Sequence, residues 1–195
     1  MKKELIAQKM GEILEILGLD LTDPLIANTP KRVAQMYVDE IFDGIDPNNF
    51  PTVTHFEQNS TKDEVITIRD IAFVSFCAHH LIPMMGRVTI SYIPQHKLLG
   101  FSKIHDIVRF HAHRPQLQER LTEEIATSIA TLLEIEDIAV TCTATHFCVV
   151  ARKGEDQSST VETSLRKGVF KLPQNVAGIT EPTTCTTALA NTAPK

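Results

Sequence analysis

The sequence predicts an α+β protein built around an antiparallel sheet. Apolar residues follow the 3.6-residue period of helices up to about residue 41, and the β-branched and aromatic residues typical of strands are frequent from 65 onward. Helical spacing returns over 103–134, and strand alternation follows it from 138 to 170. Two helices, two strands, two helices and two strands therefore come in blocks. Such an order is typical of antiparallel sheets and not of regular βαβ repeats.

Length and composition exclude several classes of protein. The chain has 195 residues, of which 43% are hydrophobic and 22% charged, which excludes disorder, collagen and a coiled coil. The net charge of −5 offers nucleic acid no favourable global field. No stretch approaches the roughly 20 apolar residues of a membrane span, and charges interrupt the first 17 residues throughout. We therefore expect a cytoplasmic protein that binds neither nucleic acid nor membrane. Its four scattered cysteines favour metal binding over disulfides.

We expect three segments along the chain. The first, 1–50, contains a helix over 3–17 that Gly18 ends, and a second helix that opens at Asn28-Thr29-Pro30 and stops at Asp43-Gly44. The second, 51–170, carries the sheet and its helices. The third, 171–195, is rich in Thr, Ala and Pro, which predicts a loose tail.

The strands are expected as two pairs. Val65–Phe76 predicts a strand, and a turn at Pro83-Met84-Met85-Gly86 separates it from a second strand at Arg87–Ile93. Apolar residues share one parity from Ile138 to Val150, which predicts one strand of thirteen residues. Its partner is expected at Thr160–Phe170. Helices are expected at about 103–113 and 116–134, separated at Arg114-Pro115.

Two short clusters carry metal-ligating side chains. The first is Cys77-Ala78-His79-His80 at the end of a predicted strand, and the second is His146-Phe147-Cys148. On a strand, residues two apart share a face at a spacing of roughly 7 Å. Two thiolates with up to three imidazoles suit zinc better than calcium or magnesium. The pattern leaves two alternatives open, a closed structural site with four ligands and a catalytic site with three and a water position.

Two helix starts are candidates for substrate binding. Gly100-Phe101-Ser102-Lys103 offers backbone N–H groups, a hydroxyl and an ammonium for an anion, although an ordinary helix cap has the same composition. Gln118 and Glu119 could accept hydrogen bonds from the donor edge of a base. The alternative for this pair is a capping carboxylate with neighbouring arginines.

Taken together, these segments resemble the GTP cyclohydrolase I family. The resemblance rests on six stretches that run in the family's order from Thr29 to Phe170: TPKRVAQMYVDEIFDG, CAHH, GRVTISYIP, LGFSKIHDIVRFHAHRPQLQERLT, THFCVVAR and TSLRKGVF. It implies the tunnelling fold over 51–170, a four-stranded antiparallel sheet with two helices on one face. It also implies a homodecamer of two pentameric rings with active sites shared between neighbouring subunits.

The resemblance also implies a reaction and a role for each matching residue. Zn²⁺ held by Cys77, His80 and Cys148 would activate water for attack on C8 of the guanine of GTP. Formate would leave, and 7,8-dihydroneopterin triphosphate would enter pterin and tetrahydrofolate biosynthesis. The remaining residues have the following implied roles: His79 protonates the purine nitrogen, His146 lies near the ribose or phosphates, Glu119 and Gln118 hold the guanine edge, and Ser102, Lys103, Arg32 and Arg152 face the ribose and triphosphate.

The sequence departs from the family pattern at three positions. Ala78 replaces the usual glutamate, Asp106 an arginine, and Gln35 a lysine. The last two changes remove three units of positive charge from the implied phosphate site, which would weaken triphosphate binding by roughly tenfold or more. Arg109, Lys153, Arg166 and Lys167 could replace the lost charges, but Arg109 could equally pair with Asp106 one turn away.

Three functions remain open from the sequence. The first is a zinc-dependent GTP cyclohydrolase I. The second is a zinc hydrolase of the same fold that acts on a less phosphorylated purine or pteridine. The third is a non-catalytic binding module stabilised by a closed zinc site, which would need His79 or His146 as the fourth ligand.

Overall fold

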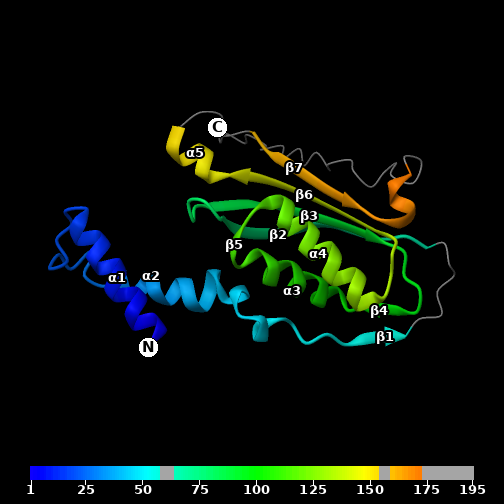
Figure 1. Ribbon diagram of the computed structural model, residues 1–195, viewed down its shortest axis with the longest axis horizontal. Helices are drawn as coiled ribbons and strands as arrows, with labels where there is room; N and C mark the ends of the chain where they lie inside the picture. Colours follow the sequence, from blue (N-terminus) through cyan, green and yellow to red (C-terminus); the bar gives the residue numbers. More distant parts are fainter. Residues whose placement is uncertain (58–63, 154–158, 173–195) are drawn as a thin grey trace, which may run out of the picture.

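The computed structural model describes residues 1–57, 64–153 and 159–172. Figure 1 shows an elongated molecule with a helical pair at one end and a sheet covered by two helices at the other. The helices and strands, in chain order, are α1 (Lys2–Ile16), α2 (Thr29–Met36), β1 (His55–Glu57), β2 (Ile66–Cys77), β3 (Pro83–Tyr92), β4 (Lys97–Leu99), α3 (Phe101–Ala112), β5 (Pro115–Gln116), α4 (Gln118–Leu133), β6 (Ile138–His146), α5 (Phe147–Lys153) and β7 (Val161–Arg166). A π-helical turn at Tyr37–Ile41 extends α2, and short 3-10 turns lie at Asp43–Ile45, Pro47–Asn49 and Gly168–Lys171.

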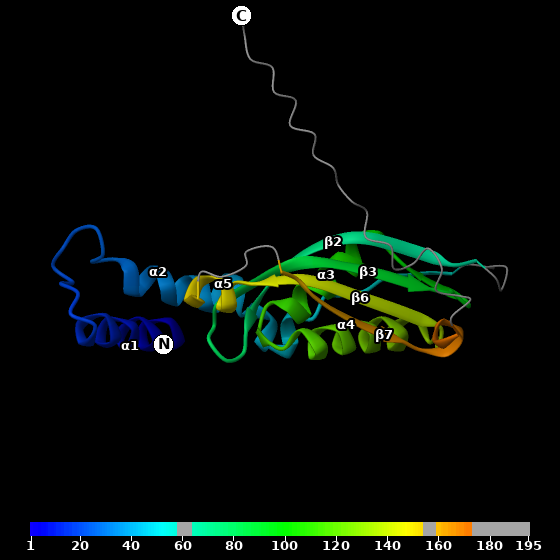
Figure 2. The ribbon, with the colours of Figure 1, turned by 90° about the horizontal axis from the view of Figure 1, so that it is seen from above.

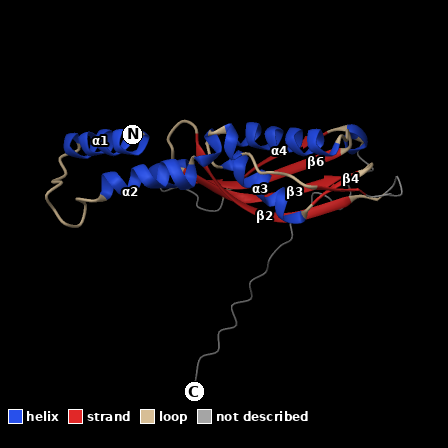
Figure 3. Ribbon diagram, turned by 90° about the horizontal axis from the view of Figure 1, so that it is seen from below, coloured by secondary structure: helices blue, strands red, loops and turns tan. Residues whose placement is uncertain are grey.

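The main sheet has the strand order β5-β2-β3-β6-β7. The long strands β2, β3, β6 and β7 pair antiparallel with one another in this order, and the two-residue β5 runs parallel to β2. Helices α3 and α4 lie on one face of this sheet, as Figures 1 and 3 show. A separate small sheet pairs β1 with β4. The predicted α+β class is confirmed, and the arrangement is the four-stranded antiparallel sheet with two helices that defines the tunnelling fold.

The core forms where the two helices meet the sheet. Ile104 and Ile107 of α3 and Ile125 and Ile129 of α4 are essentially inaccessible to solvent, as is Val140 of β6. Each such side chain stabilises the fold by roughly 1.5–3 kcal/mol relative to an exposed one. Their helical spacing is the reason both helices bury one face and leave the other polar.

Helices α1 and α2 form a pair beside the sheet domain (Figures 1 and 2). Gly18 follows α1 with φ +84°, a left-handed conformation that glycine adopts without strain. The N–H of Gly18 bonds to the carbonyl of Glu15, and that of Leu19 bonds to Leu14. This is a Schellman motif, and it confirms that Gly18 ends the first helix.

The predicted turn at residues 83–86 is wrong, because these residues begin β3. The turn lies at residues 78–82, where the N–H of Cys77 bonds to the carbonyl of Ile82 at 2.9 Å and Leu81 has φ +53°. Proline is tolerated at the first position of a strand, which Pro83 occupies. Gly86 is needed for close packing against β6 and not for a turn, because a Cβ there would lie 2.1 Å from the carbonyl oxygen of Thr143.

The predicted thirteen-residue strand is also wrong in its last part. β6 ends at His146, and the chain continues as α5. His146 pairs with Met84, next to the first residue of β3, so a longer β6 would have no partner on that side. A helix satisfies the backbone groups that a ladder would leave unpaired. The partner strand β7 likewise ends at Arg166, earlier than predicted.

The boundaries of the three predicted segments stay a prediction. The expected loose tail at 171–195 lies outside the described residues from 173 onward. Within the described ranges, none of the helices is both long enough and apolar enough to cross a membrane.

Candidate metal and substrate site

Three metal-ligating side chains converge at one end of the sheet. Cys77 ends β2, His80 lies in the turn that follows, and Cys148 belongs to the first turn of α5. One potential ligand atom from each lies within 4.8 Å of the others. The sheet register explains the convergence, because β3 pairs with β2 at Phe76 and with β6 at His146.

The route by which Cys148 reaches this group differs from the prediction. We expected His146 and Cys148 on one face of a strand, whereas the strand ends at His146 and Cys148 is helical. Burial raises the pKa of the Cys148 thiol, and the adjacent Cys77 thiol raises it further. Two thiols at such close range repel each other as thiolates, so a divalent cation between them would favour both charged forms.

The donor set fits zinc. Two sulfur atoms and one imidazole nitrogen are the soft and borderline ligands that Zn²⁺ prefers. Within the described residues the group contains three such donors. Three protein ligands leave a fourth position open, as catalytic zinc sites do. The predicted ligands Cys77, His80 and Cys148 are therefore brought together.

The ligand group opens into a hollow of about 210 Å³. The chain lines it with the ends of β2, β3 and β6 and with the start of α4. Its lining residues are Cys77, His79, His80, Met84, Gln116, Leu117, Gln118, Glu119, His146 and Cys148. Of the predicted catalytic and base-binding residues, His79, His146, Gln118 and Glu119 all lie here.

Glu119 and Gln118 differ in their surroundings. Glu119 is exposed in the first turn of α4, and among the described residues it has no hydrogen-bond or ion-pair partner. Gln118 is only 2% exposed, and its side chain is bound to protein groups on both its nitrogen and its oxygen. Glu119 is thus available to a ligand, whereas Gln118 is already engaged.

Arg152 and His79 lie directly at the metal group. The guanidinium of Arg152 donates to Nε2 of His80 at 2.8 Å, and Nδ1 of His80 lies 3.8 Å from Sγ of Cys77. Nδ1 of His79 is 3.7 Å from the same sulfur. Arg152 is therefore placed to present a positive charge at the rim of the hollow.

The other predicted phosphate residues lie elsewhere in this chain. Ser102 and Lys103 are at the start of α3, beside β4, whereas the metal group lies at the opposite end of the sheet (Figure 1). Arg32 is exposed on α2. One chain alone does not bring these three residues to the hollow.

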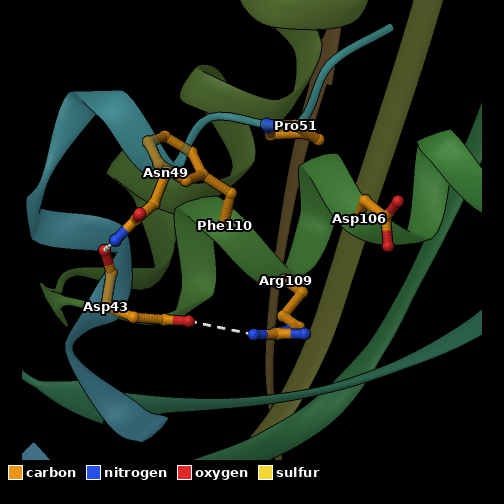
Figure 4. Close-up of a pocket in the computed structure, with 6 residues that line it drawn as sticks. All are labelled: Asp43, Asn49, Pro51, Asp106, Arg109 and Phe110. Carbon is orange, nitrogen blue, oxygen red and sulfur yellow. Dashed lines mark hydrogen bonds and ion pairs between the residues drawn. The ribbon is translucent and has the colours of Figure 1, made fainter. Parts of the chain in front are cut away.

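Carboxylates neutralise the cations on the outer face of α3. Nζ of Lys103 lies 3.0 Å from a carboxylate oxygen of Asp106. The guanidinium of Arg109 bonds at 2.9 Å to Asp43, which also contacts His113 at 2.8 Å. In Figure 4 the Arg109–Asp43 pair lies on one side of a small pocket, and Asp106 lies apart from it. The suggested Arg109–Asp106 pair is therefore wrong, because each residue has another partner.

Sequence reasoning did not identify Gln116 as part of the site. Its main-chain carbonyl accepts the N–H of Ala78 at 2.9 Å, so it fixes the turn that carries His79 and His80. Its side-chain amide donates to the carboxylate of Glu124 and to the carbonyl of His111. Its place directly after Arg114-Pro115, where a helix is interrupted, is the one signal in the sequence.

Fold and site together define the class: a tunnelling-fold protein with a three-ligand metal group at the end of its sheet. The family model for GTP cyclohydrolase I matches residues 6–180. GTP cyclohydrolase 1 of Vibrio cholerae is 49% identical over 170 residues, which cover 87% of this chain and 78% of that protein. The enzyme of the same name from Sodalis glossinidius is 48% identical over 174 residues, covering 89% and 79%. The chain belongs to the GTP cyclohydrolase I family.

Proposed function

We propose that the chain is a zinc-dependent GTP cyclohydrolase I. It hydrolyses the guanine imidazole ring of GTP at C8, releases formate and forms 7,8-dihydroneopterin triphosphate, the first step of pterin and tetrahydrofolate biosynthesis. The observation that carries this proposal is the group of Cys77, His80 and Cys148 within 4.8 Å, in one hollow with His79 and Glu119. The close relatives that bear this enzyme's name support it.

Zinc bound by these three residues would act as a Lewis acid and would lower the pKa of a bound water to about 7. The chain's own residues do the rest. Glu119, exposed and unpartnered among the described residues, accepts hydrogen bonds from N1–H and the 2-amino group of guanine. His79 donates a proton to the imidazole-ring nitrogen of the purine, which makes C8 more electrophilic. His146 acts on the ribose side of the substrate.

The triphosphate part of the site is completed by a second copy of the chain. Ser102, Lys103 and Arg32 lie away from the hollow of their own chain. Among the described residues, only the two of β5 pair with the outer edge of β2, and the six-residue β7 forms the opposite edge of the sheet. Open edges of this kind favour strand pairing between copies. These features support the homodecamer of two pentameric rings with shared active sites.

One observation favours a second candidate, a zinc hydrolase that acts on a less phosphorylated purine or pteridine. The ion pair between Lys103 and Asp106 leaves little net positive charge at the expected phosphate site. The binding-module alternative has less support, because the metal group has three donors within the described residues and His146 is bound to Gln118.

The test is to incubate zinc-loaded protein separately with GTP, GMP and guanosine while following formate and pterin fluorescence. His79→Ala and protein treated with a chelator serve as blanks. Fastest turnover of GTP is the expected result. Turnover of only the less phosphorylated compounds would favour the second candidate. Zinc binding without turnover of any of the three would overturn both catalytic functions.

A further inference from the structure

We propose that Gln118 is a positioning residue that fixes the orientation and the tautomer of His146. In this arrangement the ring carries its proton on Nε2, and Nδ1 is the nitrogen that accepts a proton from the substrate. The catalytic part of this inference rests on the proposed function; the location of the proton does not.

The orientation of the Gln118 amide follows from its neighbours. One terminal atom of the side chain lies 3.0 Å from the carbonyl oxygen of Cys142 and 2.9 Å from that of Val161. The hydroxyl of Thr163 lies 3.2 Å from the same atom. Two carbonyl oxygens can only accept hydrogen bonds, so this atom must be the NH₂ nitrogen. The reversed amide would place oxygen against oxygen in a buried site.

The tautomer of His146 follows in turn. The other terminal atom of the Gln118 side chain is then the oxygen, and it lies 2.7 Å from Nε2 of His146. An amide oxygen only accepts, so Nε2 must donate and must carry a proton. In the neutral ring, Nδ1 is left with a lone pair. Within residues 1–57, 64–153 and 159–172, Nδ1 has no hydrogen-bond partner.

The amide is held firmly enough to impose this geometry. Gln118 is the first residue of α4, Cys142 belongs to β6, and Val161 and Thr163 belong to β7, so the amide joins a helix to two strands. The hydroxyl of Thr122 also bonds to that of Thr163 at 2.7 Å and to the main-chain oxygen of Gln118 at 2.8 Å. Rotating the amide toward a substrate would break several buried hydrogen bonds.

The roles of the two neighbours on α4 therefore separate. Glu119 contacts the base, whereas Gln118 acts through His146 and not by holding the guanine edge as the resemblance implied. When Nδ1 takes a proton from a substrate hydroxyl or water, the ring becomes an imidazolium. The Nε2–H bond to Gln118 persists, and its amide oxygen then stabilises the charged ring.

The first experiment locates the proton directly. Zinc-loaded protein is prepared with ¹⁵N-labelled histidine, and the ring nitrogens are observed by solid-state NMR well above the ordinary imidazole pKa. The signals of His146 are those absent from a His146→Gln sample. We expect a protonated Nε2 and an unprotonated Nδ1, with that preference lost in Gln118→Met. A wild-type ring protonated on Nδ1 would overturn the inference, whether or not the protein turns over GTP.

The second experiment tests action through His146. We expect Gln118→Met to lower kcat by about tenfold or more, with KM for GTP within about threefold. In a His146→Gln background the same substitution should change kcat by less than about twofold, because the residue it positions is gone. An undiminished effect in that background would contradict a positioning role.

Thr122→Val is the matched control for a general loss of stability. It removes hydrogen bonds from the same buried cluster but leaves the Gln118–His146 bond in place, so kcat should stay within about twofold of wild type. A loss of kcat equal to that of Gln118→Met would show that the cluster matters only for folding. If the wild type has no activity on GTP, the proposed function fails and the NMR result alone decides this inference.

Discussion

Replacing Asp106 should improve the binding of the triphosphate. The carboxylate of Asp106 lies 3.0 Å from Nζ of Lys103, the lysine proposed to face the phosphates. Asp106→Asn releases that lysine and removes a negative charge that repels the substrate. We therefore expect KM for GTP to fall while kcat changes little.

The size of the expected change in KM follows from the solvent exposure of the two side chains. The side chains of Lys103 and Asp106 are 34% and 43% exposed, so the pair is worth about 0.5–1 kcal/mol and not the several kcal/mol of a buried pair. Removing the repulsion adds a contribution of similar size, for about 1–2 kcal/mol in all. KM for GTP should thus fall roughly five- to thirtyfold, and Asp106→Arg should lower it further.

The assay measures KM for GTP and the inhibition constant of guanosine at low and high salt. The fall in KM should be seen for GTP, without a matching fall in the inhibition constant of guanosine. It should become smaller as the salt concentration is raised, because exposed charges are screened. Glu123→Gln is the control, since it makes the same change in net charge on the exposed face of α4. An equal gain for guanosine, or an equal gain in the control, would refute a local effect on the phosphates.

Three further predictions concern the metal, the base and acid stability. Cys148→Ser should lose stoichiometric zinc and activity, measured by metal analysis, whereas the buried Cys142→Ala should retain zinc. Glu119→Gln should lower kcat/KM for GTP at least ~100-fold, because an amide N–H would face the guanine donors; Glu123→Gln should not. Burial, with Arg114 nearby, lowers the pKa of His111 to about 4 despite the opposing charge of Glu124. As the pH falls below the ordinary histidine pKa of about 6.5, the unfolded chain therefore protonates at His111 before the folded chain does. The free energy of unfolding is lost between about pH 6.5 and pH 4. Between pH 7 and pH 5 that loss is about 2 kcal/mol by urea unfolding, and it should diminish in His111→Phe; an unchanged loss would contradict the assignment.

The block order of helices and strands could be predicted because it depends on local periodicity. The helices around α3 and α4 and the stop at Gly18 follow from side-chain spacing and from one glycine. The turn before β3 could not be placed, because Pro83 and Gly86 favour a turn locally. Only the neighbouring strand β6 shows that Gly86 is needed for close packing.

Of the candidate site, the three residues that could hold a metal were predictable from the sequence, but the geometry that brings them together was not. The clusters around Cys77 and Cys148 carry the right donors for a metal, yet the length of β3 decides that Cys148 is helical. The hydrogen-bond partners of Gln118 could not be predicted either, because they lie on β6 and β7, which only the folded sheet brings to the start of α4. Lys103 and Arg109 each lie three residues from Asp106 on the same helix, so spacing allows either ion pair, and only the structure shows that Lys103 is the partner of Asp106.

The register of β3 has a consequence for how the three-residue group would bind a metal. Cys77 and Cys148 are distant in sequence, and they meet only after β3 has paired with β2 on one side and β6 on the other. The unfolded chain therefore has no preformed three-ligand site, and metal binding selects the fully paired sheet. At a free metal concentration 100 times the Kd, this selection adds about 2.7 kcal/mol to the stability of the folded state. A metal bound by Cys77, His80 and Cys148 would thus stabilise the folded state, and its presence would report that the central strand has paired on both sides.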